Sequence, residues 1–185
     1  SYVYTPAAEP PDTSPITAAA TLEKDRLAKA EEANAKGGDF VSALYSAGNA
    51  DKQHPMVVDM NGNSLSLESA SRNKRAATIY VGDNQSVEIE NAAGKTVQIK
   101  ASNTDTRAAN GIYMDANANL KLAGPVLIDQ VSAKGDAADG IQMNGTIGAT
   151  STLTIDGPLT IRNVTGRETK MAGDGRNLAG IDIVA

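Results

Sequence analysis

A six-residue phrase, Ala-x-Gly-Ile-x-Met, occurs at 109–114 and again at 138–143, and a looser copy, AGIDIVA, occupies 179–185. A short chain that repeats one strand-like phrase at regular spacing is usually built from stacked copies of one structural unit. The spacing of the repeats is therefore the strongest constraint on the fold.

From Met56 onward, apolar and polar residues alternate, which is typical of strands with one buried face. Three phrases recur in a fixed order, and copies of the first phrase lie 33 residues apart, as do two Gly-Pro turns at 124–125 and 157–158. The first phrase is VEI at 87–89, LKL at 120–122 and LTI at 153–155; the second is LSL at 65–67, VQI at 97–99, VLI at 126–128 and LTI at 159–161; the third is IYV at 79–81, IYM at 112–114, IQM at 141–143 and IDI at 181–183.

The order of the phrases favours parallel stacking over hairpins, because like phrases lie a full copy apart rather than across a two-residue turn. The pattern predicts an all-β solenoid, a parallel β-helix with three short strands per coil and about four coils over 56–185. Ile89, Leu122 and Ile155 should then share one inward row, with successive coils about 4.8 Å apart. A strand-turn-strand meander or a β-sandwich is the alternative.

The composition agrees with a core of stacked small side chains. Hydrophobic residues make up 41% of the chain and aromatic residues 3%, with no Trp and one Phe. The formal charge of −5 argues against a dedicated nucleic-acid binder. No apolar run approaches the 18 or so residues that span a membrane, and the absence of cysteine excludes disulfides and thiolate chemistry.

The N-terminal part lacks the strand phrases. Residues 1–15 hold four of the seven prolines and are expected to form an extended or disordered leader. Ser14-Pro15 is a helix-start signal, and residues 16–36 are rich in helix formers. A second amphipathic stretch follows at 39–48, so the pattern predicts a helical cap over 16–55 that covers the open end of the first coil.

The chain resembles the secreted passenger of Gram-negative autotransporters. The resemblance is carried by the run VVDMNGNSLSLES at 57–69, by the polar Asn/Asp/Gly turns and by the coils of small residues. A helix-like N-terminal segment and the absence of cysteine from the chain add to it. It implies a right-handed β-helix, export through the protein's own C-terminal barrel (type V secretion), and display at the cell surface on the outer membrane. It also implies a part in adhesion, aggregation, biofilm formation or virulence.

The sequence differs from a complete autotransporter in that it contains no C-terminal barrel. It stops after Ile181-Asp182-Ile183 without a polar capping segment, and an uncapped last coil would expose strand edges. We therefore expect the chain to be the N-terminal part of a longer protein whose barrel anchors it to the outer membrane.

Catalytic motifs are not recognised, and we expect no catalytic residue, metal site or cofactor. His54 is the single histidine and is expected to be a surface or packing residue, and Gly173-Asp174-Gly175 is interpreted as a turn. The alternative function is a carbohydrate-active β-helix, a polysaccharide lyase or hydrolase or a tailspike-like protein, with its site outside this chain. A purely structural stalk is a third possibility. The carboxylates considered for such chemistry fall mostly in turns; they are Asp115, Asp129, Asp136, Asp139 and Asp156.

The arcs between the second and third phrases differ from the rest of the chain in length and charge. From the end of the second phrase to the first Ile of the third, copies one to three span 12, 13 and 13 residues, and the fourth spans 20. The seven added residues should project as an arm within 166–178. The arcs sum to a charge of +4, which leaves −9 on the rest of the molecule.

Because stacked coils align their arcs, these cations should form one mildly basic ridge, which is the candidate binding surface. The arc ridge consists of Arg72, Lys74, Arg75, Arg107, Lys134, Arg167, Lys170 and Arg176. Host glycans or surface proteins are the expected partners, with extracellular DNA as a further candidate and no membrane insertion. Self-association between cells would instead use the flatter strand faces, and ordinary solvated surface is the plain alternative.

Overall fold

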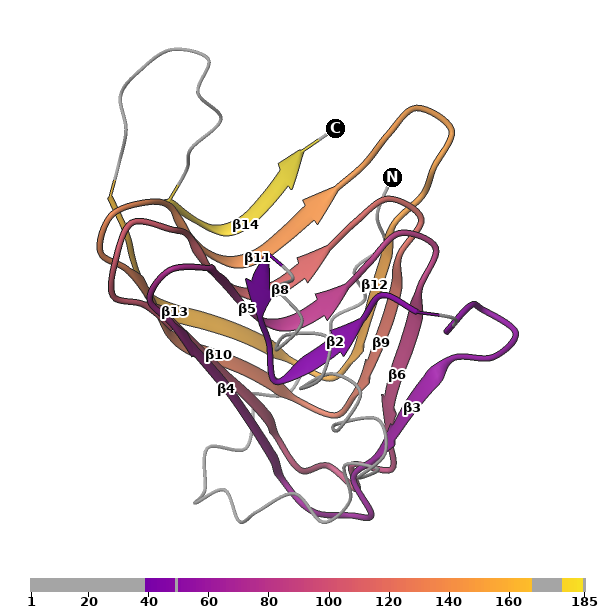
Figure 1. Cartoon of the computed structure of the whole chain (residues 1–185). Helices are drawn as coiled ribbons and strands as arrows, with labels where there is room; N and C mark the ends of the chain where they lie inside the picture. The colour runs from indigo at the N-terminus through magenta and orange to yellow at the C-terminus, as the bar shows by residue number, and fades with distance from the viewer. Residues whose placement is uncertain (1–38, 49, 168–177, 185) are drawn as a thin grey trace.

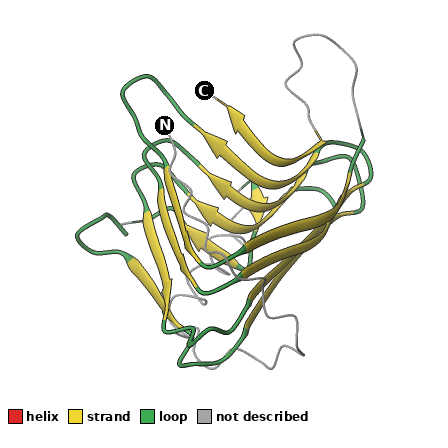
Figure 2. Cartoon of the chain, turned by 180° about the vertical axis from the view of Figure 1, so that it is seen from behind, coloured by secondary structure: helices red, strands yellow, loops and turns green. Residues whose placement is uncertain are grey.

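The computed structural model describes residues 39–48, 50–167 and 178–184, and every regular element in these ranges is a strand (Figures 1 and 2). In chain order the strands are β1 (Phe40–Val41), β2 (Leu44–Ser46), β3 (Met56–Asp59), β4 (Leu65–Ser71), β5 (Arg75–Val81), β6 (Ser86–Glu90), β7 (Val97–Asn103), β8 (Ala109–Met114), β9 (Asn119–Ala123), β10 (Val126–Ala133), β11 (Ala138–Asn144), β12 (Thr152–Asp156), β13 (Leu159–Thr165) and β14 (Leu178–Val184).

The strands form three sheets, and each strand pairs in parallel with its counterpart one coil away. The first sheet has the order β3-β6-β9-β12, the second β4-β7-β10-β13, and the third β1-β5-β8-β11-β14 with β2 also on β5. This arrangement confirms the predicted β-solenoid of about four coils. It excludes the meander and the sandwich, in which neighbouring strands would be antiparallel.

The predicted register of the first sheet is confirmed. Ile89 pairs with Leu122, and Leu122 pairs with Ile155. All three side chains are buried, with at most 1% of their surface exposed. The row is therefore continuous from coil to coil, and its apolar surface is removed from water along its whole length.

The second and third sheets also follow the phrases. Ile99 pairs with Leu67 and Ile128, and Ile112 pairs with Ile79 and Ile141. Along the third sheet, Ile79, Ile112 and Ile141 are fully buried, whereas Ile181 in the last described coil is 45% exposed. The aliphatic core is thus closed around the middle coils and partly open at the fourth.

Two kinds of turn keep the strands in register. Asn84 and Asn117 occupy equivalent turns with positive φ, 61° and 55°, and the Asn117 side-chain amide donates to the Asn84 side-chain oxygen at 2.8 Å. Asn tolerates this left-handed backbone better than most residues. At Gly157, an added Cβ would lie 2.5 Å from the backbone carbonyl of Gly124, so the repeated Gly-Pro turn packs too closely for a side chain.

A bulge first appears in β10 and continues into β13. The register of β10 against β7 shifts between Ile128 and Val131, whereas β10 and β13 stay in step through that region. Gln130 and Asn163 take equivalent positive φ values, 67° and 55°. Asp129 lies within this bulge and is only 9% exposed.

The predicted helical cap over 16–55 is wrong for residues 39–48 and 50–55, which contain no helix. Residues 39–48 form β1 and β2, which pair with β5 (Phe40↔Arg75 and Leu44↔Ile79). A short apolar stretch cannot be assigned to a helix or a strand by its period alone. The edge of β5 would otherwise leave backbone N–H and C=O groups unpaired, and hydrogen bonding to these groups stabilises residues 39–48 as strands.

The consequence for the fold is that the third sheet begins at Phe40 rather than near Met56. The proposed leader at 1–15 and helix at 16–36 lie outside the described residues. Within the described residues, no helix is long and apolar enough to cross a membrane.

Candidate functional site

The arc ridge lies where the second sheet passes into the third, so the structure brings its described members to one side of the solenoid. Three of these cations, at 72, 134 and 167, are exposed, and three, at 74, 75 and 107, are half-buried. The other two members, Lys170 and Arg176, lie outside the described residues, as does most of the predicted 166–178 arm.

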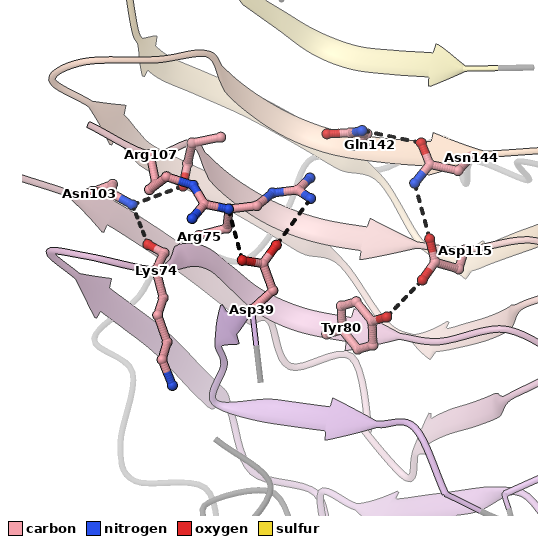
Figure 3. A network of polar contacts seen from close by, with 10 residues as sticks. Asp39, Lys74, Arg75, Tyr80, Asn103, Arg107, Asp115, Gln142 and Asn144 are labelled. Carbon is pink, nitrogen blue, oxygen red and sulfur yellow. Dashed lines mark hydrogen bonds and ion pairs between the residues drawn. The ribbon is translucent and has the colours of Figure 1, made fainter. Parts of the chain in front are cut away.

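Asp39 changes the electrostatics of the ridge, and sequence reasoning missed it. Its carboxylate lies 2.8 Å from the Arg107 guanidinium and 3.7 Å from that of Arg75 (Figure 3). The described arcs carry +3 at 70–77, 0 at 102–109, 0 at 133–138 and +1 at Arg167, and Asp39 lowers this sum of +4 to +3. Asp39 thus offsets the charge of Arg75 and Arg107 and makes no ion pair with the exposed cations at 72, 134 and 167.

Backbone carbonyls fix the shape of the first arc. The Asn103 side-chain amide donates to the Lys74 carbonyl at 2.7 Å and to the Ala108 carbonyl at 3.1 Å, and the Ser71 hydroxyl donates to the Lys74 carbonyl at 2.6 Å. These bonds join the end of β4, the start of β5, the end of β7 and the start of β8. The cations of the first arc therefore project from a backbone that side-chain hydrogen bonds hold in place.

An aromatic cluster covers the outer face of the third sheet. It consists of Phe40, Tyr45, Tyr80 and Tyr113. The rings of Tyr45 and Tyr80 are stacked with centroids 4.7 Å apart, and those of Tyr80 and Tyr113 with centroids 5.6 Å apart. Phe40 packs at 4.6 Å from Tyr80 and 4.8 Å from Tyr113. Five of the six aromatic residues of the chain are tyrosines, so this cluster concentrates a scarce residue type on one face.

Arg75 links the aromatic cluster to the ridge. Its guanidinium lies 4.5 Å from the Phe40 ring centroid and 4.9 Å from that of Tyr113. Stacking of this kind, added to the contact with Asp39, holds the side chain against the sheet. Arg75 thus helps to hold β1 on the sheet, and its side chain is less exposed to a ligand than that of Arg72.

A polar chain runs along the other end of the same strands (Figure 3). The polar chain consists of Tyr80, Asp115, Asn144 and Gln142. The Tyr80 hydroxyl donates to Asp115 Oδ2 at 2.7 Å, Asn144 Nδ2 donates to Asp115 Oδ1 at 3.1 Å, and Gln142 Nε2 donates to Asn144 Oδ1 at 3.2 Å. Ser151 Oγ donates to the backbone carbonyl of Asp115 at 2.6 Å, which links this residue of the polar chain to the following coil.

Two tyrosine hydroxyls on this face are held in their protonated form. Burial is the largest cause that raises the pKa of Tyr80 well above its ordinary value, followed by the hydrogen bond to Asp115 and its negative charge. Burial and the charge of Asp115 also raise the pKa of Tyr45. Both hydroxyls therefore act as neutral hydrogen-bonding groups at any physiological pH.

The carboxylates considered for catalysis do not gather in one place. Asp129 accepts from Asn163 Nδ2 at 2.8 Å and Arg162 at 3.2 Å, and these bonds, the one from Asn163 first, lower its pKa. Asp136 accepts from the Ala137 amide at 2.7 Å, Asp139 is buried in β11, and Asp156 is exposed at the end of β12.

The single histidine lies at the surface. His54 Nδ1 lies 3.2 Å from Asp51, and both side chains are mostly exposed. In the described part of the chain, no three His, Cys, Asp or Glu side chains come together in a way that could hold a metal ion.

Comparison with protein-family models, curated proteins and solved structures finds no match to this chain. The features that bear on function are therefore the solenoid, the arc ridge, the aromatic cluster and the polar chain.

Proposed function

We propose that the chain is a surface-exposed adhesive module of the autotransporter-passenger type, a right-handed β-helix displayed on the outer membrane. The observation that carries the proposal is the regular solenoid itself. Its inward rows are built from interchangeable aliphatic side chains, so the outer faces and the arcs are left to carry recognition. Loops and outer faces on a rigid scaffold are where binding residues concentrate.

The run at 57–69 that carries the resemblance to passengers forms most of β3, the turn at 60–64 and most of β4, and these are the first two strands of the first full coil. Two surfaces are available for attachment, the arc ridge and the outer face of the third sheet. The ridge would attract anionic partners such as sulfated glycans or extracellular DNA. That attraction would be sensitive to salt, because exposed charges are screened over about 8 Å at physiological ionic strength.

The test is attachment of beads coated with the purified chain to cultured epithelial cells, together with bead–bead aggregation. We expect coated beads to attach above the level of albumin-coated beads. Attachment and aggregation both equal to the albumin control would overturn the adhesive function.

The contribution of the ridge is measured with Arg72→Glu/Lys134→Glu/Arg167→Glu, which reverses exposed charges without touching the Asp39 contacts. Weaker heparin binding at low salt, with a smaller difference at physiological salt, is the expected result. Equal binding by parent and variant would remove the ridge from the proposal.

A further inference from the structure

We propose that the polar chain, with the Tyr45 ring at its end, is a binding site for a neutral glycan. This inference rests on the adhesive role proposed above and names a ligand class for a second surface, separate from the ridge. The aromatic cluster and the polar chain together offer the two things that a sugar needs: flat apolar surface and paired hydrogen-bonding groups.

One outward row across the third sheet holds Tyr45, Tyr80 and Gln142, and the other two residues of the site, Asp115 and Asn144, lie two residues beyond this row along the chain. Tyr45 pairs with Tyr80, Tyr80 with Tyr113, and Tyr113 with Gln142 in the parallel register. At about 4.8 Å per strand, three steps span roughly 14 Å. A ligand lying along the solenoid axis could therefore contact several coils at once.

The polar chain retains unused hydrogen-bonding capacity among the described residues. A carboxylate offers about four acceptor positions, and two at Asp115 are taken by Tyr80 and Asn144. Gln142 uses one amide hydrogen, toward Asn144, which leaves its second hydrogen and its carbonyl oxygen. Its side chain, like those of Asn144 and Asp115, is half-exposed.

This set fits sugar hydroxyls, each of which donates and accepts at the same time. A pair of neighbouring hydroxyls can donate to Asp115 or Gln142 Oε1 while accepting from the remaining amide hydrogens of Gln142 and Asn144. The internal bonds already fix the side-chain orientations, so little rotamer freedom is lost on binding.

The aromatic part of the site is the half-buried ring of Tyr45. One face of this ring stacks on Tyr80 at 4.7 Å with an interplanar angle of 13°. It is the end ring of the Tyr45–Tyr80–Tyr113 stack, and no second ring among the described residues packs against it. Its free face, which points away from Tyr80 and the polar chain, can receive the apolar C–H side of the terminal ring of an oligosaccharide that extends from the polar chain.

The charge of the site selects for neutral glycans. Asp115 is the only charged side chain of the polar chain, and its negative charge disfavours sulfated or carboxylated sugars. The arc ridge, on the opposite ends of the same strands, has the opposite preference. The two surfaces therefore predict different ligands and can be tested separately.

The test compares Gln142→Ala with Gln98→Ala by affinity for immobilised neutral oligosaccharides, with cellotetraose, maltotetraose and chitotetraose as probes. Gln98 is a matched control, since it is half-exposed and occupies the same middle position of a strand phrase on the second sheet. For at least one probe, Gln142→Ala should weaken binding about fivefold or more, the effect of losing about one hydrogen bond. Tyr80→Phe should also weaken binding, and Gln98→Ala should match the parent.

Bead attachment to cells is measured in parallel. If the parent binds none of the neutral probes but its beads attach to cells, the glycan site is overturned and the adhesive function stands. Equal affinity of the parent, Gln142→Ala and Tyr80→Phe for a bound probe would also overturn the site. If the parent binds a neutral glycan through Gln142 but its beads neither attach nor aggregate above the level of albumin beads, the site stands and the adhesive function fails.

Discussion

The inner and outer faces of the third sheet are made by the same strands and follow different rules. Ile112 and Tyr113 are adjacent in β8, yet Ile112 belongs to a row of like aliphatic residues, whereas Tyr113 belongs to a cluster assembled from unlike partners. The inner face needs only volume and apolarity at each position. The outer face depends on particular pairs, such as Tyr80 with Asp115 and Asp39 with Arg107.

This difference indicates that the inner face determines the stability of the solenoid, whereas the outer face determines which particular side chains pair. An inner residue is held by many nonspecific contacts, so a change there should act on the whole solenoid. An outer residue is held by one or two directional contacts, so its replacement should act locally. Substitutions on the two faces can test that division.

The largest effect is expected for Leu122→Asp, which places an unpaired charge in the fully buried first-sheet row. The free energy of unfolding should fall on the order of 5 kcal/mol, as measured by urea denaturation. Thr154→Asp is the control, because Thr154 lies on the outward side of the same sheet beside Lys121 and should change stability by less than about 0.5 kcal/mol. A Thr154→Asp variant less stable than Leu122→Asp would mean that the assigned inner and outer faces are reversed, and equal stability of the two variants would contradict the assignment.

A smaller loss is expected for Phe40→Ala, which removes the ring that joins β1 to Tyr80 and Tyr113. The expected cost is about 3 kcal/mol, the lower end for a buried Phe, and the amides of β2 should exchange hydrogen faster. Val41→Ala, at a half-buried position of the same strand, should cost less than about 1 kcal/mol. A cost for Phe40→Ala no greater than that of Val41→Ala would show that the outer cluster does not hold the edge strand.

A single directional contact is tested by Tyr80→Phe, which keeps the stacked ring and removes the hydroxyl that donates to Asp115. Thermal or urea denaturation should show a loss of about 1–2 kcal/mol, as for a hydrogen bond to a charged group. Tyr113→Phe is the matched control, because the Tyr113 hydroxyl makes no hydrogen bond to the described residues, and it should be close to neutral. A Tyr80→Phe variant as stable as Tyr113→Phe would remove the polar chain as a structural element.

The inner rows could be predicted to the residue because they repeat. The prediction that Ile89, Leu122 and Ile155 align is confirmed, and so are the second and third phrases. Each inner position accepts a narrow set of aliphatic residues, and that restriction is visible as a pattern in one sequence.

The outer contacts could be predicted only in part. Tyr80 and Tyr113 occupy the same position of the third phrase, so their stacking was open to inference. Phe40, Tyr45 and Asp39 come from a segment that contains no phrase, and their pairing with β5 depends on the open strand edge rather than on a repeat.

Two loop changes were hidden by the regular spacing of the first phrase. Ile89 to Val97 is 8 positions, but Leu122 to Val126 is 4; Met114 to Leu120 is 6, but Met143 to Leu153 is 10. The loss of four residues and the gain of four cancel, so the step remains 33. The longer loop lies at 145–151, and the structure adds that Ile147 in this loop is fully exposed.

The smallest expected effect is a pH dependence at Asp129, an outer carboxylate that is held from the coil above by Asn163 and Arg162. Its pKa is lowered in the folded protein, so ionised Asp129 stabilises the fold above its unfolded pKa of about 3.9. That contribution is lost as the pH falls through the lower folded pKa. Asp129→Asn should therefore be less stable than the parent at pH about 7, and the difference in free energy of unfolding should shrink below pH about 4. Asp156→Asn, at an exposed strand end, is the control and should stay close to the parent across that range. A gap between parent and Asp129→Asn that is the same at every pH would show that the loss comes from packing in the bulge and not from the charge of Asp129.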